Sequence, residues 1–287
     1  MAEGARGFFV SGPYPFPQTP IPNPLQGRWK TTLMDNAFKA LDKFLTRCSR
    51  AALLFSGGLD SSLLLAVAAK VLGPGLTAIT FTGPHTVPGE LAAAWALARR
   101  LRVQHVVRQI DPLSLPAFRH NRPERCYVCK RAVITQARQI AAARGLKVLW
   151  DGTNVDDLGE FRPGLRALRE LGVESPLLLA GLGKAAIRAW SRDLGLDADR
   201  PSQSCLATRF PYHTELTRQD LARVGQGEAW LRRRGFTRVR LRVAGDRARL
   251  ELAPAEWPAF LAPEVRGPFT ACLAGLGFSG LCLDGPG

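Results

Sequence analysis

The chain has 287 residues, of which 46% are hydrophobic and 22% charged, a balance that excludes a disordered protein and indicates a soluble globular one long enough for two domains. Its formal net charge of +15 favours polyanionic partners such as nucleotides, but only 7 of the 39 basic residues are lysine and no long basic run occurs, so nucleic acid is disfavoured without being excluded. No apolar stretch of membrane-spanning length and no signal-peptide pattern is present, which predicts a cytoplasmic protein without membrane attachment.

Residues 1–30 contain the proline-rich run SGPYPFPQTPIPNPLQG, which predicts an extended N-terminal arm without periodic structure. The next stretch, MDNAFKALDKFLTRC, places Leu33, Ala37, Leu41 and Phe44 on one face of a helix. The folded part is therefore expected to begin with this helix, and no chemistry is assigned to the arm before it.

Short apolar runs alternate with longer helical patterns from residue 51 to about residue 195. This alternation predicts an α/β domain over residues 31–211, with a doubly wound parallel sheet covered by helices on both faces. Ligands of such sheets bind beyond the carboxyl ends of the strands, near a switch in strand order. The predicted strands span 51–55, 76–82, 103–110 and 147–153, and the helices between them span about 61–72, 89–101, 129–144 and 184–194.

The pattern changes after Pro211. The run RVRLRVAGDRARLEL (238–252) alternates polar and apolar residues around a turn at AGDR, which predicts an antiparallel hairpin. A helix at about 218–234 precedes the hairpin, and the end of the chain adds another helix and a last strand. Residues 212–287 are therefore predicted to form a smaller α+β domain.

The segment SGGLDSS (56–62) lies between the first predicted strand and a helix. Glycine allows the backbone to approach a ligand closely, and the start of a helix offers unpaired N–H groups with a partial positive charge. The loop lacks the lysine of the GxxxxGK[ST] type. It resembles instead the SGGxDS signature of the pyrophosphate-loop (PP-loop) ATPases, which have adenine nucleotide alpha hydrolase-like folds and cleave ATP between the α and β phosphates. The resemblance assigns ATP to Ser56, Gly57, Gly58, Asp60 and Ser61, with Asp60 helping to place Mg²⁺, and Ser62 adds a further hydroxyl donor.

A second polar segment, DGTNVDD (151–157), follows the apolar run KVLW and falls where a strand meets the expected ligand crevice. Its composition favours nucleotide contact, and the alternative is a helix cap with an Asx turn. Lys184 and Arg188, one helical turn apart, face either phosphate or solvent. The candidate nucleotide contacts within the segment are Gly152, Thr153, Asn154, Asp156 and Asp157.

Six cysteines are too few for a disulfide scaffold in a chain of this length, and close cysteines then indicate metal or redox chemistry. Cys126 and Cys129 form a CxxC pair, and Cys205 lies in the later segment PSQSCLATRFPY. Three converging thiolates would suit a [4Fe–4S] cluster with one iron left open. The alternative is that Cys205 alone reacts. Either way, the basic neighbours Arg125, Lys130 and Arg209 are expected to lower the thiol pKa values.

Five motifs occur in one order along the chain: SGGLDSSLLL, RCYVCK, DGTNVDDLGEFRPGLRAL, SPLLLAGLGKAAIR and PSQSCLATRFPY. Together they resemble the LarE family of ATP-dependent sulfur transferases, which act in the synthesis of the nickel-pincer nucleotide, the cofactor of lactate racemase. The resemblance extends from about residue 35 to the C-terminus and is weakest in the proline-rich arm and in the last 30 residues.

The resemblance implies two chemical steps. A carboxylate of a pyridinium dicarboxylate mononucleotide attacks the α-phosphate of ATP and releases pyrophosphate, and a sulfur nucleophile then attacks the acyl-adenylate and releases AMP. In one branch of the family the sulfur is that of the cysteine matching Cys205, which ends as dehydroalanine. In another, three cysteines hold a [4Fe–4S] cluster with an extra sulfide, and Cys126 and Cys129 favour this branch. Arg209 is expected to polarise the carbonyl or to clamp a phosphate or carboxylate.

Glu228 and Glu251 resemble family positions near a substrate-side metal, and both also fit solvated surface carboxylates. Some family members are hexamers, so a homo-oligomer is expected. Three other functions stay open. A tRNA thiolase would suit the 11 arginines against 4 acidic residues in residues 201–250. In an amide-forming ligase of the NAD or GMP synthetase type the cysteines would be idle, and a nucleotide-binding regulator would show no turnover.

Overall fold

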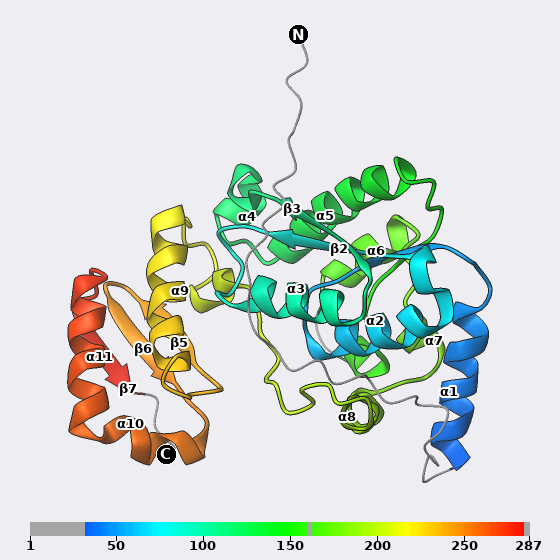
Figure 1. Cartoon of the computed structure of the whole chain (residues 1–287). Coiled ribbons are helices and arrows are strands. Elements are labelled where there is room, and N and C mark those ends of the chain that lie inside the picture. The colour runs from blue at the N-terminus through cyan, green and yellow to red at the C-terminus, as the bar shows by residue number, and fades with distance from the viewer. Residues whose placement is uncertain (1–31, 160–161, 284–287) are drawn as a thin grey trace.

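The computed structural model describes residues 32–159 and 162–283, so the proline-rich arm predicted for residues 1–30 lies outside the described residues. The larger part of the molecule is built on a parallel sheet with the strand order β3-β2-β1-β4 (Figure 1). This confirms the predicted α/β fold, although the fourth strand is shorter than predicted because the chain leaves the sheet at Asp151. β1 spans Ala51–Leu54, β2 Leu76–Thr82, β3 Gln104–Gln109 and β4 Leu149–Trp150.

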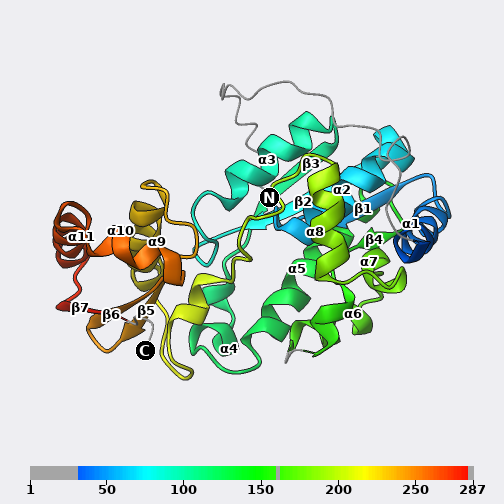
Figure 2. The same ribbon diagram turned by 90° about the horizontal axis from the view of Figure 1, so that it is seen from below.

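Helices cover both faces of this sheet, and Figure 2 shows α2 and α3 on one side and α5 and α6 on the other. Alternate strand residues point to opposite faces, so Leu53 packs with α1, α2 and α8, whereas Leu54 packs with α5 and α6. No helix in the described part of the chain is both long and apolar enough to cross a membrane. The helices are α1 (Thr32–Leu45), α2 (Leu59–Leu72), α3 (Glu90–Arg100), α4 (Pro116–Arg119), α5 (Arg125–Ala142), α6 (Gly164–Glu170), α7 (Pro176–Leu179) and α8 (Lys184–Asp193), with 3-10 turns at Gly73–Gly75, Pro112–Ser114, Val155–Gly159, η5 (Leu206–Arg209) and Pro254–Glu256.

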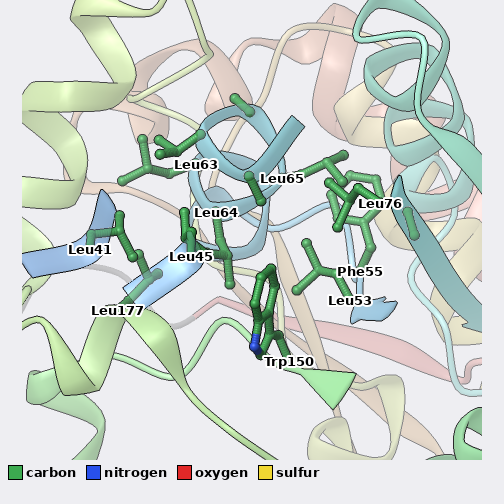
Figure 3. Close-up of a cluster of buried hydrophobic side chains, with 14 of the residues drawn as sticks. Leu41, Leu45, Leu53, Phe55, Leu63, Leu64, Leu65, Leu76, Trp150 and Leu177 are labelled. Carbon is green, nitrogen blue, oxygen red and sulfur yellow. The ribbon is translucent and has the colours of Figure 1, made fainter. Parts of the chain in front are cut away.

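The largest core surrounds α2 (Figure 3). Leu63, Leu64 and Leu65 are all fully buried, because strand residues lie on one side of the helix and α1 and α8 lie on the other. Trp150 joins them from β4. Burying one leucine side chain contributes about 1.5–3 kcal/mol, so this core firmly anchors the helix whose first turn follows the SGGLDSS loop.

The sheet order reverses at β1. From β1 the chain crosses to β2 and β3 on one side, whereas β4 pairs with β1 on the other side. The loops after β1 and β4 leave the same edge of the sheet in adjacent positions, which is where doubly wound sheets bind ligands. These two loops are SGGLDSS and DGTNVDD, so the fold brings the two predicted nucleotide segments together.

The C-terminal part has a separate sheet with the strand order β5-β6-β7. β5 and β6 form the predicted antiparallel hairpin, and β7 pairs with β6 in parallel. One helix was expected after the hairpin, but the structure has two, because Ala262 is extended and Pro263 begins a new helix. The elements are α9 (Arg218–Arg232), β5 (Arg240–Ala244), β6 (Arg247–Glu251), α10 (Trp257–Leu261), α11 (Pro263–Gly275) and β7 (Gly280–Leu283).

The two parts of the molecule share a hydrophobic core. Phe118 of α4 and Leu206 of η5 pack in one cluster with buried side chains of α9, α10 and α11. Asn121 donates its side-chain amide to the carbonyl oxygens of Phe210, at 3.0 Å, and Pro211, at 2.7 Å. The segment that connects the two parts is therefore fixed to the larger part.

His105 of β3 is a half-buried titratable group in the sheet. Its Nε2 lies 2.7 Å from the hydroxyl of Thr80, which itself donates to the carbonyl oxygen of Phe55 at 2.6 Å. Because that hydroxyl proton is already used, His105 acts as the donor through Nε2–H in its neutral form. Burial lowers the pKa of His105 from 6.5 to about 4.

The stability of the protein should fall in acid because of this histidine. The unfolded chain takes up a proton below pH 6.5, whereas His105 in the folded chain stays neutral until about pH 4. The stabilisation is thus complete above pH 6.5 and is lost as the pH falls toward 4. Between pH 7 and pH 5 we expect a loss of about 1–2 kcal/mol from His105, after allowance for partial solvent exposure. Urea unfolding at both pH values measures it, and H105Q should show the smaller pH dependence; equal dependence would contradict the assignment.

Candidate active site

The loop after β1 has the geometry of an anion cradle. The Ser56 hydroxyl oxygen lies 3.1 Å from that of Ser61 and accepts the Gly58 N–H at 3.2 Å. Gly57 has a φ of +79°, and a Cβ there would lie 3.0 Å from the Cβ of Ala94. Gly58 is the N-cap of α2 and offers no side-chain cap, so the first N–H groups of the helix are left for a ligand.

The segment after β4 packs directly against this loop. A Cβ at Gly152 would lie 2.9 Å from the backbone nitrogen of Ser61, so only glycine allows the close approach. The side-chain amide of Asn154 donates to Asp60 Oδ2 at 3.2 Å. The fold thus brings residues of both predicted nucleotide segments into contact.

The carboxyl group of Asp60 lies where its charge is disfavoured. Burial raises the pKa of Asp60, the carboxylate of Asp157 raises it further, and the hydrogen bond from Asn154 opposes both effects. Asp157 is itself buried and accepts the N–H of Asn154 at 3.1 Å. A divalent cation beside Asp60 would supply the missing positive charge, which fits the role expected of this residue.

Two predicted contact residues have structural partners. Asp156 Oδ2 accepts the N–H of Lys184 at 2.5 Å, which caps α8, and a Cβ at Gly183 would lie 2.8 Å from the same oxygen. Arg188 donates Nη1 to the carbonyl oxygen of Ala198 at 2.8 Å. The structural alternative considered for DGTNVDD, a helix cap, is therefore found at Asp156, and Arg188 holds the chain that leads toward the third cysteine.

A network centred on Asp151 was not predicted from any sequence motif. This buried carboxylate accepts hydrogen bonds from Thr153 Oγ1 at 2.7 Å and Ser175 Oγ at 2.6 Å. The ammonium group of Lys130 lies 3.7 Å from its Oδ2. Lys130 directly follows Cys129, so the network ties the helix of the CxxC pair to the edge of the sheet that presents the loop.

The three candidate cysteines come from distant segments to one neighbourhood. Cys126 and Cys129 lie in the first turn of α5, and Cys205 is the N-cap of η5. Cys129 and Cys205 pack against the same hydrophobic cluster, and both other thiols act electrostatically on Cys205. Cys126 is exposed, whereas the other two are partly buried.

The pKa values of the Cys129 and Cys205 thiols are raised, so the expectation that basic neighbours lower them is wrong for these two groups. Burial raises the pKa of Cys205 to about 12, with Arg125 acting against the rise, and burial raises the pKa of Cys129 to about 11. The positive charges do not compensate, because Lys130 pairs with Asp151. Both groups are therefore thiols at neutral pH and need an additional cation to become nucleophilic thiolates.

Within residues 32–159 and 162–283, no group of three or more His, Cys, Asp or Glu side chains is placed to hold a metal ion. The predicted cluster ligands are thus neighbours and do not form a preformed metal site. The three cysteines nevertheless fit a [4Fe–4S] cluster chemically, because such clusters prefer cysteine thiolates as ligands. With three cysteines, one of the four iron atoms has no protein ligand.

Arg209 does not occupy the ligand-facing position that the sequence predicts. Its side chain is 1% exposed, and its Nε and Nη2 donate to the Glu228 carboxylate at 2.6 and 3.2 Å. Nη1 donates to the hydroxyls of Ser204, at 2.6 Å, and Thr208, at 2.7 Å. Because these two residues flank Cys205, the guanidinium group holds the cysteine segment in place.

Glu228 differs from the interpretation as a solvated surface carboxylate because it is buried, whereas Glu251 is partly exposed. Glu228 is 0% exposed and also accepts the N–H of Leu241 at 3.0 Å and Nη2 of Arg232 at 2.7 Å. Glu251 pairs with the guanidinium group of Arg242. Each carboxylate neutralises arginines of the C-terminal part.

Positive charge gathers beside the cysteine segment. Burial, and then the neighbouring guanidinium groups of Arg209 and Arg242, lower the pKa of Arg240. Such crowding favours a bound anion. A surface hollow of about 290 Å³ lies here between η5 and the hairpin, lined by Arg209, Phe210, Pro211, Arg242, Val243, Ala244 and Arg249.

Sequence analysis also missed Arg200. Its Nη1 donates to the carbonyl oxygen of Gly57 at 3.2 Å, and its charge opposes the rise that burial causes in the pKa of Glu90. Only its place five residues before Cys205 could have marked it, since nothing local distinguishes it from the other arginines. It connects the nucleotide loop to the segment that contains this cysteine.

Comparison with known proteins identifies the family. Residues 39–143, which include the loop after β1, match the asparagine synthase family model. The chain is 35% identical over 237 residues to the pyridinium-3,5-bisthiocarboxylic acid mononucleotide synthase of Lactiplantibacillus plantarum, a match that covers 82% of this chain and 85% of that protein. An uncharacterised protein of Synechocystis sp. is 36% identical over 253 residues, covering 88% and 94% of the two chains. An uncharacterised protein of Methanocaldococcus jannaschii is 32% identical over 188 residues, covering 65% and 71%.

These matches agree with the order of motifs along the chain and with the loop geometry at the switch point of the sheet. The match to the synthase extends over most of both chains, and the asparagine synthase family model covers the nucleotide loop of this chain. The chain therefore belongs to the LarE family of PP-loop enzymes, which use ATP.

Proposed function

We propose that this protein is an ATP-dependent sulfur transferase, which adenylates a carboxylate of a pyridinium dicarboxylate mononucleotide and then inserts sulfur to give a thiocarboxylate. The observation that carries the proposal is the physical connection between the nucleotide loop and the three cysteines. The name of the Lactiplantibacillus plantarum relative, a bisthiocarboxylic acid mononucleotide synthase, supports the choice of substrate.

Two contacts make this connection. Arg200, five residues before Cys205, donates to the carbonyl oxygen of Gly57 in the loop. Lys130, next to Cys129, pairs with Asp151 at the start of the segment that packs on the loop. The sulfur-bearing residues and the phosphate cradle are thus parts of one framework, as an enzyme needs when an activated acyl group formed at the loop must meet sulfur.

In the first step a substrate carboxylate oxygen bonds to the α-phosphorus of ATP, and pyrophosphate leaves with the electron pair of the broken P–O bond. The first N–H groups of α2 and the hydroxyls of Ser56 and Ser61 hold the departing phosphates. Asp60, oriented by Asn154, is the residue that would hold Mg²⁺, which supplies positive charge to the phosphates.

In the second step sulfur bonds to the acyl carbon, and AMP leaves with the electrons of the broken C–O bond. One source is Cys205 itself: after its sulfur has attacked, loss of the Cα proton breaks the Cβ–Sγ bond and leaves dehydroalanine. The other source is a sulfide on a [4Fe–4S] cluster that Cys126, Cys129 and Cys205 would hold, and the CxxC pair favours this source.

The basic hollow beside η5 is the proposed site for the phosphate of the mononucleotide. Arg242 and Arg249 line it, and a phosphate there would relieve the crowding of guanidinium groups. Because the hollow borders the segment after Cys205, a substrate held there would place its ring toward the cysteines.

Protein purified without oxygen tests the source of sulfur. We expect about four iron atoms per chain with matching acid-labile sulfide, and their loss in Cys126→Ala. Cys272→Ala, which changes a partly buried cysteine of α11, is the matched control and should keep its iron. If anaerobic reconstitution leaves the protein without iron, the cluster source is wrong, and the Cys205 peptide should then lose H₂S after one turnover.

Pyrophosphate release tests the first step independently of the sulfur source. The protein should release pyrophosphate and AMP when ATP, Mg²⁺ and the pyridinium dicarboxylate mononucleotide are present together. Absence of pyrophosphate release with this substrate would contradict the proposed function as a whole.

A further inference from the structure

Arg125 has a combination of burial and unsatisfied charge that the fold does not explain. It is the first residue of α5 and is 7% exposed. Its Nε and Nη1 atoms are buried, and neither has a hydrogen-bond partner among the residues that the structure describes. Its one described contact of the guanidinium group is with the ring of Tyr212, whose centroid lies 4.7 Å from Cζ.

A buried arginine without a hydrogen-bonded partner destabilises the folded protein unless an anion binds to it. A buried charge normally has a hydrogen-bonded partner, because desolvation of an unpaired ion disfavours the folded state. Two carboxylates that could serve as counter-ions already pair with basic residues close to Arg125 in sequence, since Glu215 pairs with Arg119 and Asp151 pairs with Lys130. Glu124, the preceding residue, makes no ion pair with Arg125 in the described part of the chain.

The free N–H groups lie beside the cysteines. Arg125 directly precedes Cys126 in the first turn of α5, and its charge acts on the sulfur of Cys205. The ring of Tyr212 covers one side of the guanidinium group, and Tyr212 itself belongs to the segment that Asn121 fixes through Pro211. The donor is thus held rigidly next to the place where sulfur reacts.

We propose that Arg125 is an anion-binding residue beside the three cysteines and that its ligand is a carboxyl group, which in the reaction of the proposed function is the acyl group that receives sulfur. The inference rests on that function for the identity of the substrate. When the sulfur lone pair forms the C–S bond, the carbonyl electrons move to oxygen, where Arg125 donates a hydrogen bond to the negative charge. The electrons return as the bond to AMP breaks. A preorganised donor in a site of low dielectric favours such a charge.

The test uses two alkylating reagents that differ in charge. Iodoacetate contains a carboxylate, whereas iodoacetamide has the same reactive carbon and no charge. The ratio of their rate constants is measured at Cys126, Cys129 and Cys205 by peptide mass analysis of the full-length protein. In R125Q we expect the iodoacetate-to-iodoacetamide ratio at Cys205 to fall about tenfold, because a charge-assisted hydrogen bond is lost. R122Q, on an exposed arginine three residues earlier, should keep the ratio of the unaltered protein.

A measurement on the unaltered protein protects the test against misfolding of R125Q. Acetate should slow the reaction of Cys205 with iodoacetamide, and acetamide at equal concentration should not. An unchanged ratio in a folded R125Q protein, or equal protection by acetate and acetamide, would overturn the inference. Neither assay needs ATP or substrate, so failure here is distinguishable from failure of the proposed function, which appears as absent pyrophosphate release.

Discussion

Replacing Glu228 with glutamine should lower the free energy of unfolding by about 3–5 kcal/mol, because the change leaves buried guanidinium charge without its partner. The carboxylate of Glu228 is 0% exposed and accepts from Arg209, Arg232 and the backbone of Leu241. Glutamine has nearly the same size as glutamate and keeps one acceptor oxygen. The loss of unfolding free energy therefore measures mainly the contribution of the negative charge of Glu228. Urea unfolding of E228Q beside the unaltered protein measures it.

Glu251→Gln is the matched control. Its ion pairs with Arg242 and Arg249 are partly exposed, and such pairs contribute about 0–1 kcal/mol. A second readout follows from the position of Arg209, which donates to Ser204 and Thr208, one before and one after Cys205 in the chain. In E228Q we expect faster alkylation of Cys205, and in E251Q an unchanged rate. Equal stability losses in the two variants would contradict the role assigned to the buried pair.

Gly57→Ala should reduce ATP-dependent pyrophosphate release by about a hundredfold. The backbone at Gly57 has a φ of +79°, and a Cβ would meet Ala94 Cβ at 3.0 Å and the carbonyl oxygen of Glu90 at 3.3 Å. Neither the backbone of Glu90 nor the packed side chain of Ala94 can easily shift to make room for the new Cβ, so the loop itself must move. A displacement of about 1 Å at a site that works by positioning costs on the order of a hundredfold in rate.

Gly181→Ala is the control that separates the effect of backbone strain at a positive φ from the effect of a steric clash of the new Cβ. Its φ is +73°, close to that of Gly57, but nothing lies within 4 Å of the position of a Cβ. We therefore expect it to lose about 1 kcal/mol of stability from backbone strain and to keep its activity. Thermal unfolding and pyrophosphate release should be measured for both variants. Retention of more than about a fifth of the rate in G57A would argue against a rigid cradle.

The fold and the loop could be predicted because their signals are local. The apolar runs of β1 to β3 and the glycines of SGGLDSS are contiguous in sequence, and the rules for parallel sheets then place the loop at the carboxyl edge. The extent of β4 was not predictable in the same way: the strand spans Leu149–Trp150 rather than 147–153, and the hydrogen bonds of Asp151 with Thr153 and Ser175 that follow it are a property of the folded molecule.

The role of Arg209 was not predictable from the same information. Four residues separate it from Cys205, and that spacing suggested a ligand-facing charge. Its actual partner, Glu228, belongs to another helix, and only the packing of α9 against η5 brings the two together. Arg125 could not be predicted as a candidate site residue either. Its motif, RCYVCK, can be recognised in the sequence, but the absence of a partner for its buried guanidinium atoms is a property of the folded molecule.

The core that both parts of the molecule share also bears on how substrate reaches the site. If the C-terminal part were to swing away as a rigid body, Phe118 and Leu206 would lose their contacts with α9 and α11, and the bonds from Asn121 to the connecting segment would break. Opening about a hinge is therefore disfavoured, because these hydrophobic contacts would be lost for as long as the two parts were apart. Any opening for a ligand is thus expected to involve side chains and short loops, with the two parts of the molecule staying together.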